Sequence, residues 1–169
     1  MLYVLIVYAF NNQIRFNSRG EFNLPVGKRD FNKKMKAKLN AFIDRLQEGN
    51  YVFSCADFRD TDISGLTENS LVYCDPPYLI TCATYNEQGG WNPQCEYDLL
   101  NLLDKLDRQR IKFALSNVLR SKGNTNEILT EWLEQRDYRV IHLNHSYANS
   151  NYHKRDKTRS AEEVLILNY

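Results

Sequence analysis

The stretch Leu71-Val-Tyr-Cys-Asp-Pro-Pro-Tyr78 joins an apolar run to an acidic residue, two prolines and an aromatic residue. An apolar run that ends at such a break predicts a short strand over Leu71–Cys74. Proline has no backbone N–H, so Pro76 and Pro77 end that strand. This explanation leaves Asp75 and Tyr78 unaccounted for, and chance gives the tetrapeptide in about one in two thousand chains of this length. The sequence therefore predicts a functional site at the end of a strand.

Helical and strand patterns alternate on both sides of this motif. Apolar residues three and four positions apart predict helices over 33–48, about 96–108 and 127–135. Short apolar runs predict strands over 51–55, 71–74, 112–115, 138–143 and 164–167. This alternation is typical of a parallel α/β sheet with right-handed crossovers, covered by helices on both faces. Ligands bind beyond the carboxyl ends of the strands in such sheets, which is where Asp75 to Tyr78 is expected.

The first 32 residues follow a different pattern from the rest. Residues 11–32 are rich in Asn, Gly, Arg and Phe and have no helical or strand period, which predicts an ordered but irregular loop module. At Lys33 the first helical pattern begins. We therefore expect a boundary here, with one functional part over 1–32 and another over 33–169.

Composition predicts a soluble, cytoplasmic protein. The 169 residues are 43% hydrophobic, which is enough for one domain with a core, and no apolar run is long enough to span a membrane. The opening run Met1–Phe10 has no basic leading region and does not resemble a signal peptide. The cysteines form no C-x-x-C pair, so neither a zinc site nor a disulfide framework is indicated: Cys55, Cys74, Cys82 and Cys95.

Two basic clusters stand out from a net charge of only +1. Residues 15–38 carry eight Lys and Arg against Glu21 and Asp30. A second cluster near the end consists of Lys154, Arg155, Lys157 and Arg159. Two separate basic clusters favour contacts to a polyanion, and the alternative is ordinary solvated surface.

Two weaker signals have structural alternatives. His142 and His145 are three residues apart on a predicted strand, so their side chains point to opposite faces and no metal site is expected. Trp91 follows the tetrapeptide in sequence. It either lines a substrate-facing rim together with Tyr85 or anchors its loop onto the core.

The tetrapeptide has the groups needed to methylate an amino group on a base. The adenine amino group is a poor nucleophile because its lone pair is delocalised into the ring. The Asp75 carboxylate and the Pro76 carbonyl can accept its two hydrogens, while the prolines keep both acceptors in place. Tyr78 offers a flat ring on which a base extruded from the duplex can stack.

Five segments together resemble the Dam-type family of adenine-specific DNA methyltransferases. Asp75-Pro-Pro-Tyr78 is similar to the family's catalytic motif. Phe10-Asn-Asn-Gln-Ile-Arg-Phe-Asn17 with Gly20-Glu-Phe-Asn-Leu-Pro-Val-Gly27 resembles its DNA-recognition signature. The other three segments resemble a donor-side strand end, the strand behind the target base and the closing loop and strand: Ser54–Phe58, Phe113–Asn117, and Asn149–Tyr152 with Glu163–Ile166 and Asn168–Tyr169. The match keeps its order over nearly the whole chain.

The resemblance implies a fold, a reaction and a set of site residues. The fold is a Rossmann-like sheet that binds S-adenosylmethionine, with a small inserted DNA-recognition module. The reaction is methyl transfer to the amino group of a flipped adenine in double-stranded DNA, in a restriction-modification or phage setting. The implied catalytic residues are Asp75, Pro76, Pro77 and Tyr78. The implied donor-binding residues are Asp57, Phe58 and Asp75. The implied DNA-binding residues are Asn11, Arg15, Asn149, Asn151, Lys154 and Arg159.

One part of the family pattern is not found. Family members carry a Lys-containing loop and a glycine-rich strand-to-helix turn upstream of the recognition loops, and none of the seven glycines lies in such a turn. The resemblance therefore predicts that a donor-binding segment is missing and that a second chain could supply it. The alternatives are an inactive DNA-binding remnant or subunit, and a methyltransferase that acts on amino groups of RNA or protein.

Overall fold

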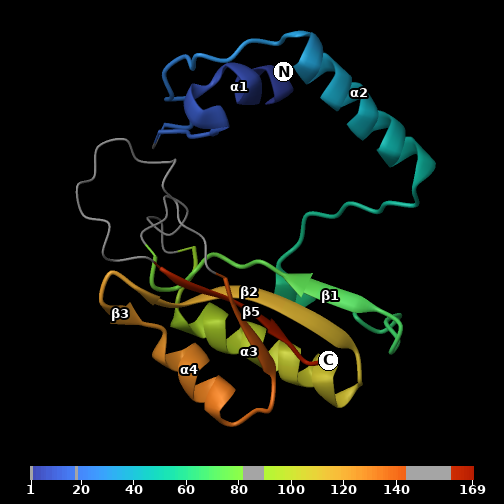
Figure 1. The fold of residues 1–169 in the computed structure, drawn as a ribbon, viewed down its shortest axis with the longest axis vertical. Helices are drawn as coiled ribbons and strands as arrows, with labels where there is room; N and C mark the ends of the chain where they lie inside the picture. The colour runs from blue at the N-terminus through green and yellow to red at the C-terminus, as the bar shows by residue number, and fades with distance from the viewer. Residues whose placement is uncertain (1, 18, 82–89, 144–160) are drawn as a thin grey trace. The chain divides into compact units, whose positions relative to one another are not determined.

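A computed structural model describes residues 2–17, 19–81, 90–143 and 161–169 (Figure 1). The chain forms two compact units, Met1–Cys55 and Ala56–Tyr169. The helix that begins at Lys33 thus belongs to the N-terminal unit, although the sequence pattern changes just before it. A functional boundary at residue 32 stays a prediction, because compactness does not test function.

The described residues of the N-terminal unit form two α-helices and a short 3-10 turn. Helix α1 covers Leu2–Tyr8, turn η1 covers Phe10–Asn12 and helix α2 covers Lys33–Glu48. The prediction of α2 is confirmed. The side chain of Asn32 caps it by accepting a hydrogen bond from the Met35 amide, and Gly49 follows its last residue. Helix α1 was not predicted as a helix.

The strand predicted over 51–55 is wrong. These residues form neither helix nor strand, and the side chains of Val52 and Phe53 are 90% and 78% exposed. Their apolar, β-forming composition was the basis of the prediction. A strand, however, needs a neighbouring strand to accept and donate its backbone hydrogen bonds. No described strand of the N-terminal unit offers one.

The C-terminal unit contains a mixed sheet of five described strands in the order β1-β2-β5-β4, with β3 paired to β2. The strands are β1 (Leu71–Cys74), β2 (Lys112–Ser121), β3 (Asn124–Thr125), β4 (Arg139–Leu143) and β5 (Glu162–Leu167). Helix α3 (Pro93–Arg108) joins β1 to β2, and α4 (Glu127–Glu134) precedes β4. The predicted helices and the other four predicted strands are all present, with bounds that differ by a few residues at several ends.

The expectation of an all-parallel sheet is wrong in one respect. β1 and β2 are parallel, whereas β5 is antiparallel to both β2 and β4. Strands β2 and β4 therefore run in the same direction on either side of β5. Parallel pairing requires a crossover, and helices were predicted before β2 and before β4 but not before β5. The helix pattern thus gives the correct relative direction of β1, β2 and β4.

The core of this unit lies between the sheet and two helices. Helices α3 and α4 pack on one another and on β2, on the same face of the sheet (Figure 1). The buried core side chains come from both helices, from β2 and β5, and from two loop positions: Leu99, Leu100, Leu103, Leu106, Leu129, Trp132, Phe113, Leu115, Val164, Ile166, Ile63 and Ile111. No described α-helix of the unit covers the opposite face, so the expected cover on both faces is not found there. In β1, Val72 and Cys74 pack against the core, whereas Leu71 and Tyr73 are exposed.

In the part of the chain that the structure describes, no helix is both long enough and apolar enough to cross a membrane.

Candidate functional site

The predicted catalytic tetrapeptide lies directly after the carboxyl end of β1. Cys74, the last residue of β1, pairs with Leu115 of the parallel strand β2. Asp75 is exposed, and Pro76, Pro77 and Tyr78 are partly buried. Since Asp75 is not part of the core, its carboxylate is accessible to a ligand. This position at a strand end is where the sequence pattern predicts a site.

Tyr78 is held by its hydroxyl group. The Tyr78 hydroxyl lies 3.1 Å from Ser116 Oγ and donates a longer hydrogen bond of 3.3 Å to Asp75 Oδ1. The Tyr78 carbonyl accepts hydrogen bonds from the backbone N–H and the hydroxyl of Thr81, which fixes the turn after the motif. Burial raises the pKa of the Tyr78 phenol. The hydrogen bond with Ser116 lowers this pKa and the nearby Asp75 carboxylate raises it. The phenol therefore stays protonated at neutral pH.

Ser116 is a site residue that sequence reasoning did not single out. It lies one position after Leu115 on β2, within the segment that resembles the strand behind the target base. Its side chain alternates with those of Leu115 and Asn117, which are buried. Because the predicted tetrapeptide follows the adjacent strand β1, this alternation is the signal that indicates Ser116.

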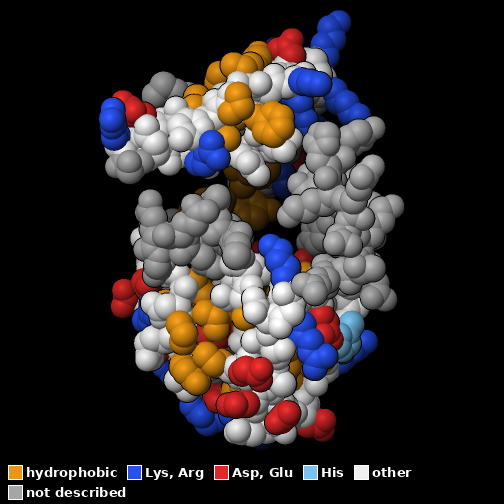
Figure 2. Space-filling model, turned by 90° about the vertical axis from the view of Figure 1, so that its left-hand side faces the viewer, with side chains coloured by type: hydrophobic (Ala, Val, Ile, Leu, Met, Phe, Trp, Pro, Cys, Tyr) orange, Lys and Arg blue, Asp and Glu red, His pale blue; other side chains and the backbone are white. Residues whose placement is uncertain are grey.

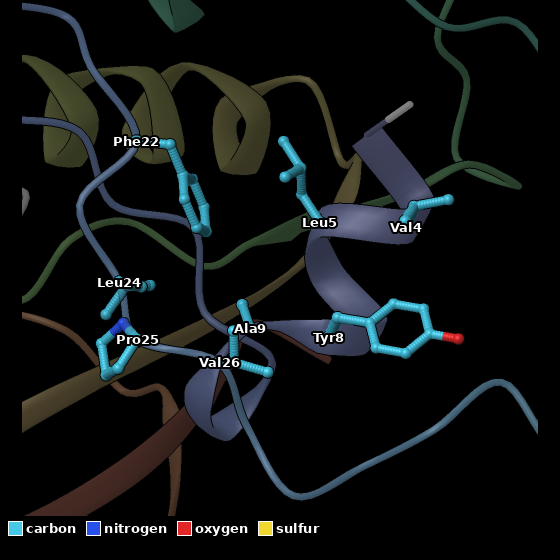
Figure 3. A pocket seen from close by; sticks show the side chains of 8 residues that line it. All are labelled: Val4, Leu5, Tyr8, Ala9, Phe22, Leu24, Pro25 and Val26. Carbon is cyan, nitrogen blue, oxygen red and sulfur yellow. The ribbon is translucent and has the colours of Figure 1, made fainter.

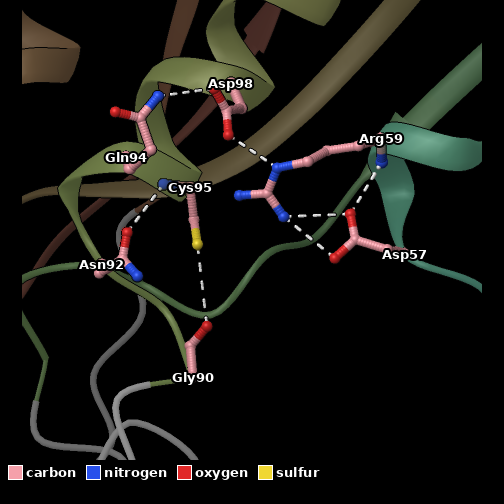
Figure 4. A network of polar contacts seen from close by, with 7 residues as sticks. All are labelled: Asp57, Arg59, Gly90, Asn92, Gln94, Cys95 and Asp98. Atoms are coloured by element: carbon pink, nitrogen blue, oxygen red, sulfur yellow. Dashed lines mark hydrogen bonds and ion pairs between the residues drawn. The ribbon is translucent and has the colours of Figure 1, made fainter.

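Asp57 begins a short 3-10 turn, η2 (Phe58–Asp60), and is tied to Arg59. Its Oδ1 accepts the Arg59 backbone N–H at 2.9 Å, and the Arg59 guanidinium lies 3.0 Å from Oδ2 (Figure 4). Arg59 Nε also donates to Asp98 Oδ2 of α3 at 2.7 Å. The hydrogen bond from the Arg59 backbone, and after it that from the Arg59 side chain, lower the pKa of Asp57. The Asp57 carboxylate is therefore ionised at neutral pH and fixed in direction.

Phe58 lies against two neighbours. The Arg59 guanidinium carbon is 4.6 Å from the centroid of the Phe58 ring, and the Trp91 ring is 5.6 Å away at 43°. Trp91 Nε1 donates to Glu96 Oε2 at 2.8 Å. Of the two roles considered for Trp91, the structure favours the anchor. Arg59, Asp98 and Glu96 carried no motif, and only the fold brings them to these positions.

Within the N-terminal unit, Asn11 and Arg15 lie in the irregular segment that follows α1. Asn11 has φ 55° and ψ 22° in turn η1, a left-handed conformation that asparagine adopts more readily than most residues. Arg15 is exposed and holds the loop through Asn23, donating from Nε to Asn23 Oδ1 at 2.7 Å and from Nη2 to Asn23 O at 2.9 Å. Guanidinium has five N–H groups, so others stay available to a ligand.

The same loop is packed onto α1 around a small apolar pocket of about 170 Å³ (Figure 3). The pocket is lined by Val4, Leu5, Tyr8, Ala9, Phe22, Leu24, Pro25 and Val26. A Cβ on Gly27 would lie 2.7 Å from the Ala9 carbonyl oxygen, so this close approach requires glycine. The loop therefore has a defined shape although it contains no regular strand, as the sequence predicts.

The remaining predicted DNA-binding residues, Asn149, Asn151, Lys154 and Arg159, lie outside the described residues. His145 also lies outside them, whereas His142 Nδ1 lies 3.2 Å from Glu162 Oε1. Among the described residues, no group of three His, Cys, Asp or Glu side chains could hold a metal ion.

The C-terminal unit thus combines a mixed sheet with an acidic, proline and aromatic motif directly after the carboxyl end of β1. A family model described as D12 class N6 adenine-specific DNA methyltransferase matches residues 1–160. The chain belongs to that family, which confirms the resemblance found in the sequence.

Three relatives show how far the similarity extends. The chain is 46% identical to Type II methyltransferase M.FokI of Planomicrobium okeanokoites and 41% identical to modification methylase StsI of Streptococcus sanguinis, each over 99% of its own length. It is 26% identical to DNA adenine methylase of Escherichia coli (strain K12) over 95% of its length. The chain spans 26% of each of the first two relatives and 54% of the third.

Cys74, directly before Asp75, gives a prediction about pH. Burial raises the pKa of the Cys74 thiol to about 11, and only the thiolate reacts readily with alkylating reagents. At neutral pH, we expect iodoacetamide to label the exposed Cys55 and to leave Cys74 largely unmodified. Labelling of Cys74 should increase only as the pH rises towards 11, which peptide mass spectrometry can follow. Fast labelling of Cys74 at neutral pH in the folded protein would contradict its burial.

Proposed function

We propose that this chain carries the catalytic face of an adenine-specific DNA methyltransferase, which transfers a methyl group to the exocyclic amino group of an adenine flipped out of duplex DNA. The observation that carries the proposal is the exposed Asp75 carboxylate at the end of β1, with the Tyr78 ring held beside it by Ser116. Membership of the N6 adenine-specific family and the name of the third relative, DNA adenine methylase, support the same reaction, and the names of the other two relatives support methyl transfer.

Asp75 and Pro76 localise the lone pair of the target amino group. The Asp75 carboxylate accepts one amino hydrogen and the Pro76 carbonyl accepts the other, which turns the nitrogen lone pair away from ring conjugation. With S-adenosylmethionine bound, the nitrogen would form a bond to the methyl carbon as the sulfur–carbon bond breaks, which leaves S-adenosylhomocysteine, and the Asp75 carboxylate or water would accept the proton that the nitrogen then loses. Pro76 and Pro77 restrict the backbone, so the acceptors need no rearrangement. Tyr78 stacks on the extruded base.

S-adenosylmethionine supplies the electrophilic methyl group. We propose that Asp57 and Phe58 hold its adenosine part and that Asp75 lies near its reactive end. An ionised, half-exposed carboxylate beside an aromatic ring fits this ligand, because the carboxylate accepts hydrogen bonds from polar N–H or O–H groups and the ring packs against a base.

We also propose that the C-terminal unit is part of a Rossmann-like methyltransferase sheet and that residues 1–32 are the end of an inserted DNA-recognition module. In this proposal, a second polypeptide segment completes the donor pocket. The edge of the described sheet supports it, because β1 lies at that edge and its Leu71 and Tyr73 side chains are exposed. Figure 2 shows apolar side chains exposed on the surface of the molecule.

The test of the function is methyl incorporation. The purified protein is incubated with S-adenosylmethionine labelled in its methyl group and with unmethylated duplex DNA, with and without a polypeptide carrying a donor-binding segment. Incorporation into the adenine amino group supports the proposal. Incorporation only with the added polypeptide means that the donor pocket needs that segment. DNA binding that weakens with salt, without incorporation under either condition, would instead indicate an inactive DNA-binding subunit, and preferred methylation of RNA or protein would indicate a different substrate.

Arg15 gives a prediction for the DNA-recognition module. Replacing Arg15 with alanine should weaken duplex binding and reduce the slope of log affinity against log salt by about one, because one phosphate contact is lost. If Arg15 instead reads a guanine, the loss should be about 1–3 kcal/mol and confined to cognate duplexes. Fluorescence anisotropy with cognate and non-cognate duplexes at several salt concentrations distinguishes the two cases.

Asn23→Ala is the matched control, because the Arg15 guanidinium donates both to the side-chain oxygen and to the backbone carbonyl of Asn23. This variant keeps the Arg15 charge and loses one of the bonds that shape the loop. An equal loss of affinity in Arg15→Ala and Asn23→Ala, with an unchanged salt slope, would mean that Arg15 only maintains the loop.

A further inference from the structure

Glu96 is a buried carboxylate that the proposed reaction does not use. It lies in the first turns of α3, where Asn92 caps the helix and Pro93 is its first residue, and its exposed fraction is 0%. Three side-chain N–H groups donate to it. Trp91 Nε1 donates to Oε2 at 2.8 Å, and Asn117 Nδ2 and Asn126 Nδ2 donate to Oε1 at 3.0 Å and 2.9 Å. A buried carboxylate needs such donors, because desolvation without them is costly.

The Trp91 N–H group connects Glu96 to Asp57 and Phe58, the residues proposed to bind S-adenosylmethionine. The indole of Trp91 is bonded to Glu96 at its nitrogen and lies against the Phe58 ring, with 5.6 Å between the centroids. Phe58 follows Asp57 directly in sequence. The position of the Phe58 ring therefore depends on an indole whose orientation is fixed by the Glu96 carboxylate.

The Asn117 amide connects Glu96 to Ser116 and Tyr78, on the side proposed to bind the target base. Asn117 of β2 is fully buried and bonds to Glu96 through its amide nitrogen. Its Oδ1 accepts the Val118 backbone N–H, so both ends of the amide are used. Its neighbour Ser116 bonds to the Tyr78 hydroxyl. The third donor, Asn126, caps α4 by accepting the Leu129 amide and has a structural role.

We propose that Glu96 is a positioning residue for the binding of S-adenosylmethionine. Its Oε2 atom fixes Trp91, and through Trp91 the Phe58 wall, in the orientation that binds S-adenosylmethionine. This inference rests on the proposed methyltransferase function and adds a residue that governs donor affinity. A purely structural carboxylate is the alternative. For stability alone, a well-packed apolar side chain is often as good as a buried carboxylate. The four buried leucines that follow on α3 show that this helix face accepts apolar side chains.

The Glu96→Gln variant separates the Trp91 bond from the two asparagine bonds. Glutamine has nearly the same shape but only one carbonyl oxygen. Since two amides donate to Oε1, that position keeps the oxygen, and the new NH₂ group faces the Trp91 N–H, which cannot accept it. Only the bond to Trp91 is lost. We expect the KM for S-adenosylmethionine to rise about tenfold, as for one hydrogen bond to a charged group. The kcat and the KM for DNA should change by less than about twofold, because the bond to Asn117 remains.

Trp91→Phe tests the same bond from the other side, because it removes the indole N–H and keeps an aromatic ring against Phe58. It should raise the donor KM by about the same factor, and the double variant should be no worse than either single variant. Trp132→Phe is the matched control. Trp132 Nε1 donates to Asp104 Oδ1 at 3.0 Å, which is the same chemistry elsewhere on α3, so its loss should leave the donor KM unchanged.

A second measurement does not depend on catalysis. The chain has two tryptophans, so Trp91 is the only fluorophore of its kind in the Trp132→Phe background. In that background, E96Q should make Trp91 emission more sensitive to quenching by acrylamide, and bound S-adenosylmethionine should reduce this sensitivity in the parent protein. Should E96Q fail to fold, the donor KM of Trp91→Phe carries the test.

The outcomes separate the two levels of the proposal. A tenfold rise in donor KM in E96Q and Trp91→Phe, without additivity, supports the positioning role. Active parent protein with an unchanged donor KM in both variants overturns it and leaves the methyltransferase function intact. A parent protein that neither binds the donor nor transfers a methyl group, with its partner segment present, overturns the proposed function and the role of Glu96 together.

Discussion

Replacing Asp75 with alanine is expected to reduce methyl incorporation at least about a hundredfold while leaving the fold intact. The loss follows because one of the two acceptors for the target amino hydrogens is removed, and a preorganised acceptor of this kind contributes several kcal/mol to the transition state. Asp75 is exposed and its bond to the Tyr78 hydroxyl is long, so the free energy of unfolding should change by no more than about 0.5 kcal/mol. Incorporation assays and denaturant unfolding measure the two quantities.

Two companion variants make this test specific. Asp75→Asn keeps one acceptor oxygen and the side-chain shape, so it should retain more activity than alanine. Asp137→Ala removes another exposed aspartate of the same unit, in the loop before β4, and should leave incorporation unchanged. Unfolding of Asp75→Ala would show that the residue maintains the structure, and the catalytic assignment would be wrong.

The sequence predicts the elements of the C-terminal unit well, because short-range rules determine them. The apolar run before Pro76 and Pro77 gave both ends of β1, and the helical spacing of five leucines between Leu99 and Leu106 gave most of α3. Where the prediction of α3 began three residues late, the cap was the missed signal: Asn92 accepts the Cys95 amide and Pro93 fills the first position, where proline is favoured.

Errors arose where the outcome depends on a distant partner. The segment 51–55 has the composition of a strand, but composition does not supply the neighbour to which a strand must bond. The antiparallel direction of β5 was missed for a related reason, because apolar residues indicate burial and not direction.

The candidate site likewise contains residues that a local motif reveals and residues that only the fold brings together. Asp75 and Tyr78 are three residues apart, so a motif reveals them. The residues around them come from separate elements. Glu96 and Asn117 are 21 positions apart, and Arg59 and Asp98 are 39 apart. Nothing in the local sequence marks these pairs, because polar residues on a helix or strand are usually solvated. They become visible only when α3 packs against β2 and η2.

The Tyr78 series tests how the target base is held. Tyr78→Ala should weaken capture of the extruded base by about 1–3 kcal/mol, which corresponds to roughly a five- to 150-fold loss in incorporation at low DNA concentration. Tyr78→Phe and Tyr78→Trp keep a flat ring and should retain most of the activity. Duplexes with the fluorescent analogue 2-aminopurine at the target position report extrusion directly, because its emission rises when it leaves the stack.

Ser116→Ala completes the series, because it removes the hydroxyl partner of Tyr78 and leaves the ring in place. If stacking is the main contribution, Ser116→Ala and Tyr78→Phe should behave alike, and both should lie much closer to the parent protein than Tyr78→Ala does. If instead Tyr78→Phe loses as much activity as Tyr78→Ala, the phenol group is required. The hydroxyl that bridges Asp75 and Ser116 would then take part in the proton transfer or in orienting the Asp75 carboxylate.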